Sequence, residues 1–184
     1  MIINPRPDSE FFSRICLPPG RPDAIEHSVG MENQPSKTLF YKRSHFVTHL
    51  PLTYLYSPSH YWLAESNGVW RVGFTKFATR MLGEIVDHQF TTESGTSVRT
   101  GEVVGWIEGF KAISDIYCVV EGEFRSANVR LKEDLEAIDR DCYHSGWLFE
   151  AVGKPDPLCT DAEGYKALLD KTIEKLLEKQ GLAG

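Results

Sequence analysis

Two short apolar runs lie close together in this chain, and their spacing restricts what it can fold into. Residues 103–107 form the first run and residues 113–120 form the second. Aromatic and β-branched residues on both sides of a short break are typical of two strands joined by a tight turn. Lys111 stands at or beside the tip of that turn. An enzyme that acylates amines could reach a lysine there, although an exposed turn also accepts a lysine without any chemical role.

The segment before this hairpin predicts further strands and one short helix. The dipeptide Asn67-Gly68 lies between two apolar runs, which is a strong signal for a β-hairpin. Thr75 can cap a short helix that Gly83 ends. The apolar face of this helix is expected to contain Phe77, Ala78, Met81 and Leu82. The strands expected around it span residues 61–64, 69–74 and 84–90.

After the lysine hairpin, the pattern predicts helices that cover the strands. Apolar residues recur at helical spacing between positions 128 and 141, so we expect an amphipathic cover there. Thr160 and Glu163 have the spacing of a capping box. The helix behind them would dock through Tyr165, Leu168, Leu169, Ile173, Leu176 and Leu177. Many short strands with few helices indicate a small all-β sandwich or flattened barrel.

Length indicates one domain with extensions. A chain of 184 residues can bury one good core and is too short for two large ones. Residues 1–50 contain many prolines and no lasting period, which predicts an irregular N-terminal extension. The apolar residues near its end should pack on the domain, because left in water they would form a large exposed apolar patch. We expect the domain at residues 51–153 and an amphipathic C-terminal helix, packed on it, at residues 154–184.

Charge and residue usage argue against several classes of function. The net charge is −6 with no basic block, which disfavours binding to nucleic acid. No apolar run reaches the roughly 18 residues of a membrane helix. The first 50 residues contain several acids, unlike a typical transit segment, so we expect a cytoplasmic protein, or a mitochondrial one in a eukaryotic host. Isolated cysteines and scattered histidines, including His45 and His49, predict neither a disulfide framework nor a metal site.

The residues around the lysine resemble those of a known family. Residues 108–115 read E-G-F-K-A-I-S-D, which is similar to the segment E-S-V-K-A-x-S-D of the glycine cleavage system H-protein. Upstream, residues 59–62 read S-H-Y-W and resemble the family's S-H-E-W. Residues 72–86 resemble V-G-I-T followed by L-G-x-I-V, and residues 143–149 resemble the closing Y-x-x-G-W-L. Several motifs in the family's order are more specific than one.

This resemblance implies a fold, a cofactor and a role. The fold would be mainly β, a lipoyl/biotinyl-type barrel-sandwich hybrid with short flanking helices and a C-terminal helix. Lys111 would carry lipoic acid as an amide, and the chain would be a non-catalytic carrier. The residues that the lipoylating enzymes would recognise are Glu108, Ala112, Ser114 and Asp115. Asp115 can equally be a solvated turn charge.

The implied partners are those of glycine cleavage. The carrier would receive an aminomethyl group at glycine decarboxylase, a pyridoxal phosphate enzyme, and deliver it to an aminomethyltransferase. Dihydrolipoamide dehydrogenase would reoxidise it, and a lipoate ligase or lipoyl transferase would modify it. Neither a nucleic acid nor a membrane is expected as a partner. His60 and Tyr61 would lie beside a cleft in which the arm can rest.

Several residues depart from the family pattern and leave other functions open. Tyr61 replaces the acid of S-H-E-W, so that position offers no carboxylate to pair with an amine on the arm. Gly109 and Phe110 replace Ser and Val before the lysine, and Val119 and Cys142 replace prolines. One alternative is a lipoyl carrier for another pathway, such as sulfur oxidation or lipoate relay. The other is an unmodified domain that kept the fold as a binding module.

Overall fold

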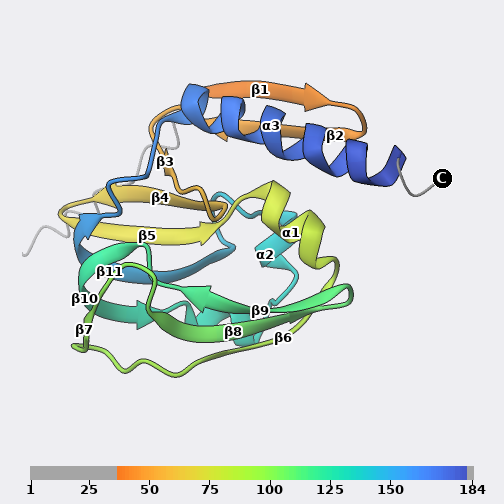
Figure 1. Cartoon of the computed structure of the whole chain (residues 1–184). Coiled ribbons are helices and arrows are strands. Elements are labelled where there is room, and N and C mark those ends of the chain that lie inside the picture. Colours follow the sequence, from red (N-terminus) through yellow and green to blue (C-terminus); the bar gives the residue numbers. More distant parts are fainter. Residues whose placement is uncertain (1–36, 182–184) are drawn as a thin grey trace, which may run out of the picture. The chain divides into compact units, whose positions relative to one another are not determined.

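Antiparallel strands dominate the computed structural model, which describes residues 37–181 (Figure 1). These residues belong to one compact unit. The larger sheet has the order β3-β4-β5-β11-β10-β7. Its strands are β3 (Leu55–Tyr56), β4 (Tyr61–Ser66), β5 (Val69–Phe74), β7 (Ser97–Val98), β10 (Val120–Ala127) and β11 (Trp147–Pro155). The smaller sheet has the order β6-β8-β9 and contains β6 (Ile85–Phe90), β8 (Val103–Gly109) and β9 (Ala112–Tyr117).

The main core lies between these two sheets. Both sheets contribute fully buried side chains to one cluster, so the expected mainly β sandwich is confirmed. Strands β8 and β9 of the smaller sheet supply Val104, Ile107 and Ile116, and the larger sheet supplies Leu63, Val72, Phe124, Leu148 and Phe149. Because apolar side chains of the lysine hairpin are buried here, the hairpin is fixed to the rest of the domain.

The turn between β4 and β5 and the helix after β5 follow the sequence pattern. Asn67 and Gly68 have φ values of 52° and 78°, as the tightest hairpin turn requires. Helix α1 (Lys76–Leu82) begins after Thr75, whose side chain accepts a hydrogen bond from the Ala78 N–H. The helix ends at Gly83 with φ 81°. One detail of the prediction is wrong: Met81 is 48% exposed and does not share the buried face.

Residues 38–51 form a β-hairpin, so the prediction of an irregular extension as far as residue 50 is wrong over this part. Strand β1 (Thr38–Arg43) pairs with β2 (Phe46–Pro51) in antiparallel register. The inner face of the hairpin packs on helix α3 (Ala162–Gly181), as Figure 1 shows. This face closes a second buried cluster that contains Tyr41, Phe46, Leu50, Tyr56, Trp62, Phe77, Tyr165, Leu169 and Ile173. The first 36 residues of the expected extension lie outside the described residues.

The C-terminal helix is present but starts later than predicted, because residues 154 and 155 end strand β11 and α3 begins at Ala162. Its cap also differs from the prediction. Asp161 rather than Thr160 caps α3, because the Gly164 N–H donates to Asp161 Oδ1 at 2.9 Å. Thr160 instead forms an isolated bridge with Tyr56. Leu177, expected on the docking stripe, is 44% exposed.

The amphipathic cover before this helix is broken into two pieces. They are a 3-10 helix, η1 (Val129–Lys132), and a short helix, α2 (Ala137–Arg140). Leu131 and Ile138 are buried as expected. No helix within residues 37–181 is long and apolar enough to cross a membrane.

Candidate functional site

Lys111 lies at the tip of a β-hairpin, as the sequence predicts. Strands β8 and β9 are joined by the two residues Phe110 and Lys111, and Gly109 pairs directly with Ala112. Both turn residues are exposed, with Phe110 at 84%. The Lys111 amine therefore projects from the bend of a paired ribbon rather than from the middle of a strand.

The backbone of this turn is fixed against the end of helix α1. The Lys111 N–H donates to the Leu82 carbonyl at 2.9 Å, and the Phe110 N–H donates to the Glu84 carbonyl at 2.7 Å. Gly109 approaches Leu82 so closely that an added Cβ would lie 2.3 Å from the Leu82 oxygen. A glycine is therefore required at this position for steric reasons, because only a residue without a side chain lets the hairpin reach the helix end.

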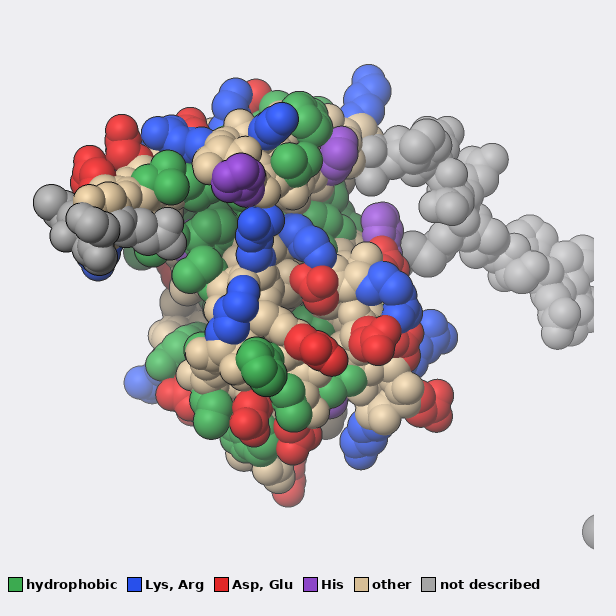
Figure 2. All heavy atoms as spheres, turned by 90° about the vertical axis from the view of Figure 1, so that its right-hand side faces the viewer, with side chains coloured by type: hydrophobic (Ala, Val, Ile, Leu, Met, Phe, Trp, Pro, Cys, Tyr) green, Lys and Arg blue, Asp and Glu red, His purple; other side chains and the backbone are tan. Residues whose placement is uncertain are grey.

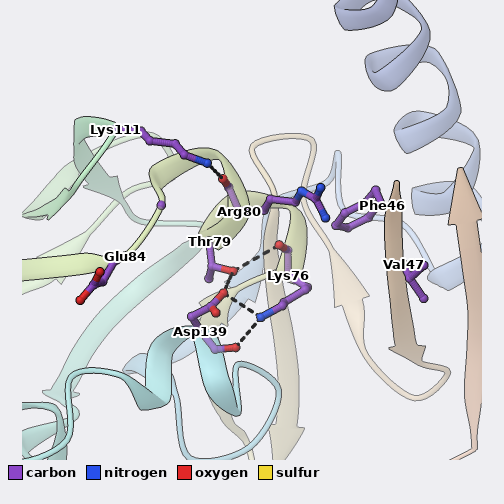
Figure 3. A pocket seen from close by; sticks show the side chains of 9 residues that line it. Phe46, Val47, Lys76, Thr79, Arg80, Glu84, Lys111 and Asp139 are labelled. Carbon is purple, nitrogen blue, oxygen red and sulfur yellow. Dashed lines mark hydrogen bonds and ion pairs between the residues drawn. The ribbon is translucent and has the colours of Figure 1, made fainter. Parts of the chain in front are cut away.

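The side chain of Lys111 is positioned without being buried. Its stem lies over Gly83, where an ideal Cβ would meet Lys111 Cγ at 3.0 Å. Its Nζ donates to the Arg80 carbonyl at 3.4 Å, as Figure 3 shows. Within the described residues, no carboxylate lies within ion-pair distance of this amine. A single long hydrogen bond to an exposed backbone oxygen leaves the nitrogen accessible to a modifying enzyme.

The other motif residues divide between the two faces of the hairpin. Residues directly opposite each other in adjacent strands point to the same face. Glu108 pairs with Ile113, and Asp115 pairs with Trp106, so both acids lie on the outer face. Ala112 and Ser114 belong to the opposite set of positions. The outer face beside the lysine thus presents two carboxylates together with Ile113, which is 70% exposed.

His60 and Tyr61, expected beside an arm cleft, do not line the pocket that Lys111 borders. Tyr61 is 2% exposed, and its hydroxyl accepts a hydrogen bond from the Tyr117 N–H at 2.9 Å. His60 has φ 68°, its Nδ1 lies 2.8 Å from the Tyr165 hydroxyl, and its ring packs on Phe77. Burial lowers the pKa of His60 to about 4. Both side chains serve the packing of the domain in this structure.

A pocket that Lys111 does border is built from other elements. It has a volume of about 290 Å³ and lies between α1, α2 and the hairpin β1–β2 (Figure 3). Its lining contains Phe46, Val47, Lys76, Thr79, Arg80, Gly83, Glu84, Lys111 and Asp139. Figure 2 shows basic side chains gathered in the middle of this face, with acidic side chains beside them. Sequence reasoning identified Gly83 as a helix end and expected apolar residues such as Phe46 and Val47 to pack on the domain, but it gave no signal for Arg80 or for a β-hairpin at this place.

Asp139, in this lining, is an ionised and paired carboxylate. Partial burial acts to raise its pKa, but hydrogen bonds from Lys76 and Thr79 outweigh this effect and hold the pKa below the usual value. Lys76 Nζ and Thr79 Oγ1 donate to Asp139 Oδ1 at 2.8 Å and 2.6 Å. Both hydrogen bonds favour the charged form of the carboxylate. Asp139 is therefore suited to holding α2 against α1 rather than to proton transfer.

No group of histidine, cysteine or acidic residues between positions 37 and 181 is arranged to hold a metal ion. His49 faces away from the core on β2 and stacks at a tilt on Phe40, with the ring centres 5.2 Å apart. Cys118 and Cys142 are buried free thiols and Cys159 is half-buried. The pKa of each of these thiols is raised, mainly by burial.

Comparisons with known proteins agree on one family. A family model described as "Glycine cleavage H-protein" matches residues 54–179. The glycine cleavage system H protein of Corynebacterium jeikeium (strain K411) is 38% identical over 125 residues, covering 66% of this chain and 98% of that protein. That of Shewanella sp. (strain ANA-3) is 33% identical over 129 residues, covering 68% of this chain and 99% of that protein.

A solved structure gives the same result for the fold. The glycine cleavage system H protein of Mycobacterium marinum superposes with a TM-score of 0.59 at 29% sequence identity. The match covers 64% of this chain and 97% of that one. The barrel-sandwich fold expected from the sequence is therefore confirmed. Together with the family model, these relatives show that the chain belongs to the glycine cleavage H-protein family.

Proposed function

We propose that this protein is a carrier that bears lipoic acid on Lys111 and moves the aminomethyl group of glycine from glycine decarboxylase to an aminomethyltransferase. The observation that carries the proposal is the position of Lys111. Its backbone is fixed by the hydrogen bond to Leu82, whereas its amine is exposed and bonded only at 3.4 Å to a carbonyl. A carrier needs both properties, because partner enzymes must find the attachment point in a defined place and reach its nitrogen.

The residues present fit an amide-linked lipoyl group. Acylation forms an amide bond between the deprotonated Nζ and the carboxyl carbon of a lipoate activated as a mixed anhydride or thioester. The bond to the activating group breaks, that group leaves with one Nζ hydrogen as a proton, and the amide nitrogen keeps one hydrogen. That hydrogen can still donate to the Arg80 carbonyl, so the modification does not remove the contact. When bound, the group supplies the disulfide that accepts the one-carbon unit; the protein supplies attachment and orientation.

The acids beside Lys111 are best suited to recognition. Glu108 and Asp115 share the outer face of the hairpin with exposed Ile113. A lipoate ligase or lipoyl transferase that approaches the tip meets this face together with the turn. Dihydrolipoamide dehydrogenase, which would reoxidise the arm, meets the same tip. Ala112, which is exposed, and Ser114, which is half-buried, lie at the opposite set of positions on β9.

Mass spectrometry of protein purified from its native host tests the attachment. The intact protein should carry one lipoyl group, a tryptic peptide should place it on Lys111, and Lys111→Arg should abolish it while the circular dichroism spectrum is unchanged. Protein without the modification, from cells that contain lipoylated enzymes, would refute the carrier assignment and favour a binding module.

A separate exchange assay tests the pathway. Lipoylated protein mixed with glycine decarboxylase and carboxyl-labelled glycine should support exchange of the label with bicarbonate, and Lys111→Arg should not. If the lipoylated protein supports no exchange, glycine cleavage is the wrong pathway and a lipoyl carrier for another pathway becomes the better assignment. The assay also tests whether the carrier works without a carboxylate at position 61, because Tyr61 stands where the family has an acid.

A further inference from the structure

Three large apolar side chains are exposed around the turn that carries Lys111. Phe110 in the turn, Ile113 on β9 and Val86 on β6 are 84%, 70% and 56% exposed. Val86 lies in the bulge of β6, between the two residues that pair with the end of β8. Figure 2 faces the side to which this turn points in Figure 1 and shows hydrophobic side chains below the basic ones. Apolar residues scattered singly over a surface are ordinary, whereas apolar residues grouped at one place mark contact sites. We call these three residues the tip cluster.

Phe110 is fixed at its backbone and free at its ring. Within the part of the chain that the structure describes, it takes part in no aromatic pair and in neither buried cluster. Its N–H donates to the Glu84 carbonyl at 2.7 Å, and the next N–H, that of Lys111, donates to the Leu82 carbonyl at 2.9 Å. An aromatic side chain with only two rotatable bonds loses little conformational entropy on binding. Burial of such rings contributes much of the stability of protein interfaces.

The enzyme that acylates Lys111 is the partner that must contact this ring. Reaction requires the acyl carbon to come within about 3–3.5 Å of Nζ. Phe110 directly precedes the lysine in a two-residue turn, so an enzyme that reaches the amine also reaches the ring. Enzymes that act on the sulfur end of the arm are separated from the turn by the length of the arm. The exposed ring is therefore best placed for the enzyme that attaches the arm.

We propose that Phe110, with Ile113 and Val86 beside it, is the docking anchor by which the enzyme that acylates Lys111 selects this carrier. The inference rests on the proposed attachment of lipoic acid to Lys111. The enzyme takes the ring into an apolar pocket next to the opening that receives the amine. The family pattern has valine where this chain has Phe110. A pocket shaped for a phenyl ring leaves empty space around valine, so it discriminates against carriers with the smaller residue.

Lipoylation kinetics test the docking role. The host's own lipoate ligase or lipoyl transferase is supplied with saturating acyl donor, and the concentration of the carrier is varied. Phe110→Ala should raise KM at least about tenfold and change kcat less than about twofold, because the ring binds equally before and during acyl transfer. Phe110→Val should have an intermediate KM. Phe40→Ala removes another exposed ring, on β1 and outside the tip cluster, and should leave both constants unchanged.

Inhibition separates docking from acyl transfer. Lys111→Arg cannot be acylated but keeps Phe110, so an excess of it should inhibit lipoylation of the unmutated carrier. The double variant with Lys111→Arg and Phe110→Ala should need at least about ten times the concentration for the same inhibition. The circular dichroism spectra and Tm values of both variants should match, because the ring that is removed lies outside the buried clusters.

The outcomes distinguish this inference from the proposed function. Unchanged kinetic constants for Phe110→Ala, with equal inhibition by the two Lys111→Arg proteins, would overturn the docking role while the attachment to Lys111 stands. Normal lipoylation of Phe110→Ala, followed by slow exchange of its lipoylated form with glycine decarboxylase, would assign the ring to that enzyme and also overturn it. If no lipoylating enzyme of the host modifies the unmutated protein, the proposed function is refuted and this inference with it.

Discussion

Substitution of Gly109 by alanine should both destabilise the domain and displace the lysine. An alanine Cβ would lie 2.3 Å from the Leu82 oxygen, whereas real Cβ atoms essentially never come closer than 3.0 Å to such an atom. The helix end and the hairpin must therefore separate by at least 0.7 Å, the difference between these distances. The same movement stretches the bond from the Lys111 N–H to the Leu82 oxygen, which is 2.9 Å long.

The expected magnitude follows from overpacking. Forcing an extra methyl group into packed structure costs about 1–3 kcal/mol, and for a domain of this size each kcal/mol lowers Tm by roughly 2–4 °C. Calorimetry of Gly109→Ala should show such a loss, and ligase-catalysed lipoylation should be slower. Gly181→Ala adds the same methyl group in open space and serves as the control. If Gly109→Ala has the Tm and the lipoylation rate of the unmutated protein, the close contact does not position the lysine.

The remaining predictions concern hydrogen bonds and one half-buried histidine. Tyr61→Phe leaves the Tyr117 N–H without its 2.9 Å acceptor, so urea unfolding should show a loss of about 1–3 kcal/mol; an unchanged midpoint would contradict this. The folded pKa of His60, about 4, lies below its ordinary value of 6.5, so the unfolded state binds the proton first. Its stabilising contribution, complete above pH 6.5, should fall by about 2–3 kcal/mol between pH 7 and 4.5. His60→Asn should flatten that part of the urea stability profile, and an equally steep profile would exclude His60 as its cause. Asp170→Asn weakens the hold on β1, so hydrogen exchange of the β1 amides should accelerate without a change in β8; equal protection in both proteins would speak against this.

Local sequence signals predicted the elements that depend on local chemistry. Asn67 and Gly68 both have positive φ values, which few other residue pairs accept. Gly83 likewise has a positive φ at the end of α1. The lysine hairpin was predictable because a short break separates its two apolar runs. In each case the residue type itself restricts the backbone, so the position of Lys111 at a turn could be inferred without knowledge of the rest of the fold.

Features that depend on distant partners could not be predicted in this way. Strands β1 and β2 are stable because α3, more than a hundred residues later, buries their inner face, as the pair Tyr41 and Asp170 illustrates. The capping box failed for a similar reason: the Tyr56 backbone pairs with Thr160 and moves the helix start by one residue. The pocket beside Lys111 also combines residues from β2, α1 and α2, which no single stretch of sequence brings together.

The end of helix α1 explains how one short element can both anchor the turn and orient the lysine side chain. The last carbonyls of any α-helix have no donors within the helix. Here Gly83 ends the helix, the Leu82 carbonyl accepts the Lys111 N–H, and the Arg80 carbonyl accepts its Nζ. The partial negative charge at a helix C-terminus favours such donors. The backbone bond does not involve Nζ, and an amide formed on Nζ would keep one N–H for the Arg80 carbonyl, so the same helix end could hold Lys111 before and after the proposed modification.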